Sequence, residues 1–113
     1  MGFKEAYRFP SPDGRPSTTF LQINRDTFIE MAPPGGGNQP QPAGLTHLGL
    51  YTDDADATVA QLRQAGAANV ADARPSENSG SRLANITDPN GIRIEFNQQP
   101  TGSLMKKAMD AWR

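Results

Sequence analysis

The side chains best suited to chemistry are one histidine and two glutamates, which lie in segments that alternate like β-strands. His47 is the only histidine of the chain, and Glu30 and Glu95 each stand between two bulky apolar residues. Because successive residues of a strand point to opposite faces, each of the three opposes the apolar face of its own strand. An imidazole and two carboxylates can bind a divalent ion such as Zn²⁺, Ni²⁺, Mn²⁺ or Fe²⁺. A carboxylate that leaves the metal could act as a general base, so Glu30 and Glu95 are also the catalytic candidates.

These residues also have simpler explanations. A histidine on a strand is usually a hydrogen-bonded polar group, and the two glutamates can be solvated strand carboxylates. Arg93 lies two residues before Glu95 on the same predicted face and could form an ion pair with it.

Three further side chains are candidates for binding an anionic substrate: Tyr51, Arg82 and Arg93. Arginine suits carboxylate and phosphate groups because its planar guanidinium presents several donors. The alternative is that these three residues are ordinary exposed groups at the rim of the fold.

The composition limits the possible functions. The 113 residues suffice for one domain, and 11 Gly and 10 Pro favour a fold rich in loops and short strands. A net charge of −1 makes nucleic acid a poor partner. The absence of cysteine excludes disulfides and thiolate catalysis, and it fits a cytoplasmic protein. No apolar stretch approaches the length of a membrane span or a signal peptide, so we expect no membrane partner.

The first part of the sequence predicts three strands and a linker. The segments 3–9, 17–23 and 27–31 are rich in β-forming residues, and turn signals at 11–16 and 24–26 separate them. Residues 32–44 contain four Pro and four Gly, a composition typical of a linker.

The second part predicts a strand, a helix, three strands and a final helix. The segment 46–52 alternates, and Thr52 or Asp53 is the expected N-cap of a helix that ends at Gly66. Short strands are expected at 69–73 and 81–87, and the Asp88–Gly91 turn leads into a strand at 92–97. Residues 104–112 are expected to form a helix.

The combined pattern resembles the vicinal oxygen chelate superfamily, which includes glyoxalases, bleomycin resistance proteins and extradiol dioxygenases. The residues that carry the resemblance are THLGLYTDD, a helix that ends at Ala65-Gly66, and RLANITDPNGIRIEF. The resemblance covers essentially residues 2–97. It implies an α+β fold in which paired βαβββ modules form an incomplete barrel around a divalent metal ion.

The resemblance also implies a domain plan. The chain, 1–113, would be a single domain with a partial first module at 1–31, a linker at 32–44, a complete βαβββ module at 45–97 and a C-terminal helix at 103–113. The first module would lack its first strand and helix, and with them one metal ligand. The implied ligands that remain are Glu30, His47 and Glu95, at the first-strand or last-strand positions of the two modules.

Three functions remain open from the sequence. The first is a metal-dependent lyase, isomerase or dioxygenase that acts on a small molecule with vicinal oxygens. The second is a metal-free protein that binds a small molecule, and the third is a truncated, inactive member of the family. An incomplete first module would leave a sheet edge and an apolar face uncovered, so we expect a homodimer or a higher homo-oligomer.

Overall fold

The computed structural model describes residues 2–34 and 43–113, which form two compact units. The central unit is Leu45–Ser103. The N-terminal unit combines Met1–Gly44 with Leu104–Arg113 at the end of the chain. Each unit contains one sheet and one helix. Among the described residues, neither helix has the length and apolar character that crossing a bilayer requires.

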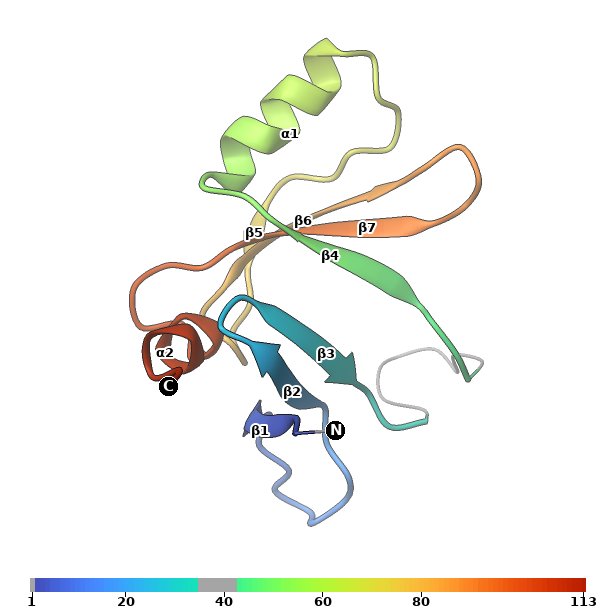
Figure 1. The fold of residues 1–113 in the computed structure, drawn as a ribbon. Helices are drawn as coiled ribbons and strands as arrows, with labels where there is room; N and C mark the ends of the chain where they lie inside the picture. Colours follow the sequence, from blue (N-terminus) through green and yellow to red (C-terminus); the bar gives the residue numbers. More distant parts are fainter. Residues whose placement is uncertain (1, 35–42) are drawn as a thin grey trace. The chain divides into compact units, whose positions relative to one another are not determined.

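The central unit contains a four-stranded sheet in the order β4-β7-β6-β5 (Figure 1). Its strands are β4 (His47–Tyr51), β5 (Arg74–Pro75), β6 (Arg82–Thr87) and β7 (Arg93–Gln98). β4 and β7 are parallel, whereas β7 with β6 and β6 with β5 are antiparallel. The Asp88–Gly91 turn joins β6 to β7: Gly91 has φ +84°, and its N–H donates to the Asp88 carbonyl at 3.0 Å. Glycine adopts this left-handed conformation without a steric penalty.

Helix α1 (Ala55–Gln64) begins and ends at well-formed caps. The Asp54 carboxylate accepts a hydrogen bond from the Ala57 N–H at 2.9 Å, which satisfies a backbone donor at the helix start. At the other end Gly66 has φ +85°, its N–H donates to the Arg63 carbonyl, and the Ala67 N–H donates to the Leu62 carbonyl. This pair of bonds is a Schellman motif, so Gly66 ends the helix as the sequence predicts.

The core of the central unit lies between α1 and one face of the sheet. Its buried residues are small: Ala55, Val59, Ala73 and Ala84, with Val70 and Phe96 packed against them. Small side chains allow α1 to approach β6 and β7, which it contacts (Figure 1).

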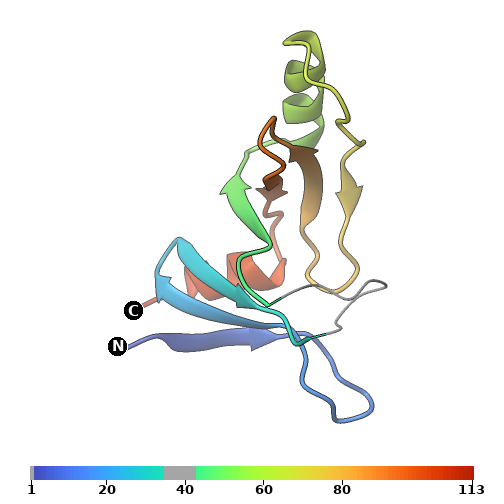
Figure 2. The ribbon, with the colours of Figure 1, turned by 90° about the vertical axis from the view of Figure 1, so that its right-hand side faces the viewer.

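The N-terminal unit contains the antiparallel sheet β1-β2-β3 and helix α2. Its elements are β1 (Lys4–Arg8), β2 (Thr19–Asn24), β3 (Thr27–Met31) and α2 (Leu104–Asp110). Figure 2 shows α2 beside this sheet, and the Gln22 side chain donates to the Ala108 carbonyl at 3.2 Å. Tyr7 and Phe20 stack with ring centroids 4.5 Å apart.

The predicted α+β class is confirmed, with two small sheets and no closed barrel among the described residues. Most of the predicted linker, residues 35–42, lies outside the described residues.

Two local predictions were wrong. The N-cap of α1 is Asp54, not Thr52 or Asp53, because Asp54 is extended and its side chain reaches the first helical turn. The expected strand at 69–73 is replaced by β5 at Arg74–Pro75, since Asn69 adopts φ +58°, which a strand does not allow.

Candidate functional site

The register of β4 and β7 gathers most of the candidate side chains on one face of the sheet. In this parallel pair His47 lies opposite Arg93, Gly49 opposite Glu95, and Tyr51 opposite Asn97. Partners in register share a face of the sheet, so these six residues line one side of it. We call this side the polar face; β6 adds Leu83, Asn85 and Thr87 to it, which lie opposite Asn97, Glu95 and Arg93. The other side, the helix face, carries Leu48, Leu50, Ile94, Phe96 and Ala84 and packs in part against α1.

His47 and Arg93 are in direct contact on the polar face. The Arg93 Nη2 lies 2.8 Å from the His47 Nδ1, and the Thr46 Oγ1 lies 3.0 Å from the same nitrogen. A guanidinium carries donors and no acceptor, so Nδ1 must receive this hydrogen bond through its lone pair. In a neutral imidazole the proton then resides on Nε2.

Glu95 receives a hydrogen bond from its neighbour in the same strand. The Asn97 Nδ2 donates to the Glu95 Oε1 at 3.2 Å and to the Glu95 carbonyl at 3.3 Å. Gly49 makes room for this amide, because a Cβ at position 49 would lie 3.3 Å from the Asn97 Nδ2. His47 and Glu95 are diagonal neighbours on adjacent strands. Residues at such diagonal positions are roughly 7–8 Å apart.

Asn85 belongs to the same face but was not predicted from the sequence. Its Oδ1 is buried and has no hydrogen-bond partner among the described residues. Asn85, Asn97 and Gly49 could have been found by combining the alternation of Arg93–Gln98 with the tight Asp88–Gly91 turn. That turn fixes which residues of β6 oppose those of β7.

Arg82 lies on the helix face, apart from the residues of the polar face. It is opposite Gln98 in register, and its guanidinium binds the Asp56 carboxylate of α1 through two hydrogen bonds of 2.6 and 2.8 Å. This hydrogen bonding lowers the pKa of Asp56 and raises the pKa of Arg82. A third bond of 3.1 Å reaches the Ala73 carbonyl, so Arg82 ties α1 and the chain before β5 to the sheet.

Glu30 is part of the N-terminal unit, where its surroundings differ from those of Glu95. It lies opposite Phe20 in the β2–β3 pair, and Tyr7 lies opposite Phe20 on the other side. The face that carries Glu30 therefore also carries a stacked aromatic pair.

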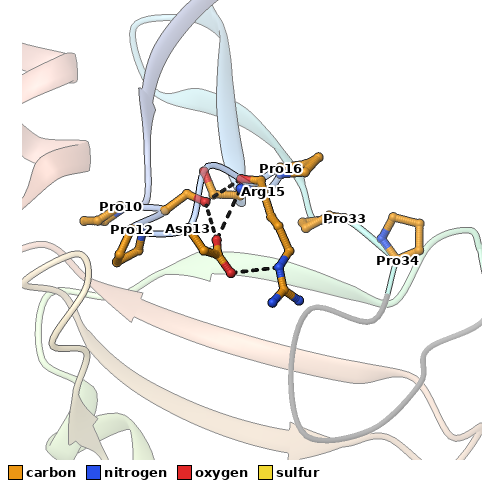
Figure 3. A pocket seen from close by; sticks show the side chains of 9 residues that line it. Pro10, Pro12, Asp13, Arg15, Pro16, Pro33 and Pro34 are labelled. Atoms are coloured by element: carbon orange, nitrogen blue, oxygen red, sulfur yellow. Dashed lines mark hydrogen bonds and ion pairs between the residues drawn. The ribbon is translucent and has the colours of Figure 1, made fainter.

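The N-terminal unit also contains a shallow hollow of about 560 Å³ (Figure 3). Five prolines line it, together with Asp13 and Arg15, which form an ion pair of 2.7 Å. None of the predicted metal ligands or substrate-binding residues belongs to its lining. Both charged groups of the hollow bind each other, so it offers little chemistry beyond apolar contact.

A family model matches residues 1–96, which include both sheets up to the middle of β7. Its description is the Glyoxalase/Bleomycin resistance protein/Dioxygenase superfamily. The chain belongs to this superfamily. The resemblance inferred from the THLGLYTDD and DPNG segments is therefore confirmed.

Ten chains of solved structures match the sequence, among them the three that follow, and no curated protein matches it. SMU.1112c is 25% identical with a TM-score of 0.49, and the match covers 86% of this chain and 80% of that chain. A glyoxalase family protein from Enterococcus faecalis is 20% identical with a TM-score of 0.48, over 86% and 79% of the two chains. A lactoylglutathione lyase from Agrobacterium tumefaciens is 21% identical with a TM-score of 0.41, over 86% and 75%.

Membership of the superfamily raises the question of whether the candidate ligands fit a divalent metal ion. Among the residues that the structure describes, no three or more His, Cys, Asp or Glu side chains are grouped closely enough to hold one. The Nδ1 of His47 is engaged by the Arg93 cation, and the Glu95 carboxylate is engaged by Asn97. In this arrangement the side chains of the superfamily member do not fit a metal ion.

Proposed function

We propose that this member of the superfamily binds a small organic molecule on the polar face, without a resident metal ion. The observation that carries the proposal is the parallel β4–β7 register, which aligns His47, Tyr51, Arg93 and Glu95 on the face opposite the helix. A face with both donors and acceptors can recognise a ligand by directional hydrogen bonds. The opposite face has its own role, because it packs against α1.

The charges of the polar face favour a ligand with an anionic group. Arg93 has five N–H donors, of which Nη2 contacts His47, and a planar carboxylate matches the geometry of such a donor set. Tyr51 adds a phenol from the end of β4 and is 45% exposed. Glu95 and Asn97 supply a carboxylate and an amide for hydroxyl groups of the ligand. We assign Arg82 a structural role instead, because its guanidinium is bound to Asp56.

A second candidate function is a metal-dependent lyase or isomerase. In favour of it, His47 and Glu95 are diagonal neighbours on the same face. In that case Glu30, His47 and Glu95 would be the metal ligands, and Glu30 and Glu95 the acid–base residues. The contacts of His47 with Arg93 and of Glu95 with Asn97 favour the metal-free function.

We further propose that two copies associate through β4, and that the protein is cytoplasmic. β4 is at one end of the strand order, and Leu48 and Leu50 are 48% and 49% exposed. The segment His47–Tyr51 is nearly symmetric about Gly49. Antiparallel pairing of two copies around Gly49 would therefore set Leu48 against Leu50 of the partner subunit. A cytoplasmic location accords with the absence of cysteine.

Light scattering after size-exclusion chromatography tests the association. We expect the wild-type chain to elute as a dimer or a higher oligomer, and Leu48→Glu to elute as a monomer. Ile92→Glu is the matched control, because Ile92 is similarly exposed at 46% but lies outside β4. A monomeric wild-type chain would contradict the proposal.

Calorimetric titration with salicylate tests the ligand-binding proposal. Salicylate is small and flat and carries a carboxylate next to a hydroxyl group, whereas phenol lacks the anionic group. We expect saturable binding of salicylate and weaker binding of phenol, because only the carboxylate can pair with a guanidinium. Equal binding of the two compounds, or no binding of either, would overturn the proposal.

A further inference from the structure

The contact between Arg93 and His47 places a positive charge where a metal ion would approach the imidazole. The two residues are in register on adjacent strands, and Nη2 is 2.8 Å from Nδ1. Arg93 is the residue of β7 directly opposite His47, two positions before Glu95. Any ion shared by His47 and Glu95 would therefore be close to this guanidinium.

The hydrogen-bond chemistry of the pair opposes coordination through either nitrogen of the ring. A metal-bound histidine uses the lone pair of one nitrogen and donates the N–H of the other to an acceptor. Coordination through Nε2 would place a proton on Nδ1, where it would point at the N–H of Arg93, which cannot accept it. Coordination through Nδ1 would require the guanidinium to leave that nitrogen altogether.

Other contacts are compatible with the same arrangement. Thr46 Oγ1 also lies within hydrogen-bond distance of Nδ1, and a hydroxyl can donate to the lone pair that accepts from Arg93. The Glu95 carboxylate is held by Asn97, whose amide lies over Gly49. His47 and Glu95 are thus both bound by protein hydrogen-bond donors at or next to the atoms that would coordinate a metal ion.

We infer that the guanidinium of Arg93 prevents a metal ion from binding to His47, so that the polar face binds an anionic ligand instead. The inference rests on the proposed function of this face and adds to it how the face excludes metal ions. According to this inference, the exclusion of metal ions depends on one side chain, that of Arg93. Removal of the guanidinium should restore to His47 and Glu95 the ability to bind a divalent ion.

The test is a calorimetric titration of the full chain with Ni²⁺. We expect Arg93→Met to bind Ni²⁺ at least about 10-fold more tightly than the wild-type chain, the size of effect that the surroundings of a histidine ligand commonly have on metal affinity. His47→Ala in the Arg93→Met background should remove the gain. Arg74→Met is the control for charge, because Arg74 lies on the same side of the sheet but on β5, which β6 separates from β7, and it should leave the affinity unchanged. Tight binding by the wild-type chain through His47, or no gain in Arg93→Met, would overturn the inference.

A second measurement needs no variant, in case Arg93→Met fails to fold. Nitrogen-15 NMR of the His47 ring at mildly alkaline pH identifies which nitrogen carries the proton. We expect a protonated Nε2 and an unprotonated Nδ1, whereas a protonated Nδ1 would overturn the inference. The salicylate titration of the wild-type chain separates the two proposals. If the wild-type chain does not bind salicylate, the proposed ligand site is wrong. If it binds Ni²⁺ through His47, only the proposed role of Arg93 is wrong.

Discussion

The two faces of the four-stranded sheet differ in what their side chains do, although they are built from the same strands. On the helix face Ala84 and Phe96 pack against α1, and the ion pair of Arg82 with Asp56 fastens the helix to the sheet. On the polar face Arg93, Glu95 and Asn97 bond to neighbours within the face. Stability should therefore depend mainly on one face, and ligand recognition on the other.

Two arginines that look alike in the sequence lie on different faces of the sheet. Arg82 and Arg93 belong to paired strands, yet Arg82 is opposite Gln98 and Arg93 is opposite Thr87. These positions are on opposite faces, so one guanidinium meets a carboxylate of the helix and the other an imidazole. Residue type alone does not show on which face of the sheet an arginine lies, whereas the strand register does.

The largest expected effect is on the helix face. Phe96→Ala should lower the free energy of unfolding by about 3 kcal/mol, because it removes a large side chain packed against the core. Urea unfolding followed by circular dichroism measures the change. Salicylate affinity under folding conditions should stay the same, and a parallel loss of affinity would show that the two faces are not independent.

On the polar face, Arg93→Met should weaken salicylate binding by about tenfold, the loss expected for one charge-assisted hydrogen bond. The unfolding curve should hardly move, since Arg93 is exposed. Calorimetry on Arg93→Met and on the control Arg74→Met measures the difference. If both variants lose affinity equally, net charge and not the position of Arg93 determines binding.

Gly49→Ala should produce a smaller change confined to the polar face. The added methyl group would lie 3.3 Å from the Asn97 Nδ2, so the amide must shift by a few tenths of an ångström. We expect altered NMR signals of the Asn97 side chain and a stability change of about 1 kcal/mol or less. Unchanged Asn97 signals would mean that the amide does not lie over Gly49 in solution.

The smallest expected effect is the pH dependence of the ion pair between Arg82 and Asp56. The pKa of Asp56 is lowered in the folded chain, so its contribution to stability is present above the ordinary value of 3.8 and is lost as the pH falls below it. Both partners are partly exposed, so the effect should be modest. Asp56→Asn should flatten the decrease in stability in that acidic range, as urea midpoints at several pH values would reveal. If the stability of Asp56→Asn decreases as steeply as that of the wild-type chain, other carboxylates cause the decrease.

Local signals in the sequence predicted much of the fold. Gly66 ended the helix, and the Asp88–Gly91 turn joined two antiparallel strands, because each depends on a few adjacent residues. Thr27–Met31 was predicted with the correct bounds for the same reason. The strand expected at 69–73 was wrong, since Asn69 takes a left-handed conformation that its neighbours in the sequence do not signal.

The candidate site depended on pairings that adjacent residues do not determine. β4 and β7 pair across the intervening helix and two strands, and a shift of one residue would move every side chain to the other face. The sequence therefore placed Arg93 near Glu95 but could not show that it faces His47. The segment Arg82–Thr87 lacks a clean alternation, so its residues could not be assigned to faces before the register was known.

The most direct test of the division between the two faces is a titration of the ¹⁵N-labelled chain with salicylate, followed by amide NMR. The account predicts that the largest shifts fall on His47, Gly49, Arg93, Glu95 and Asn97, and that the amides of α1 stay unchanged. Shifts concentrated in α1, or around the proline-lined hollow of the N-terminal unit, would contradict it.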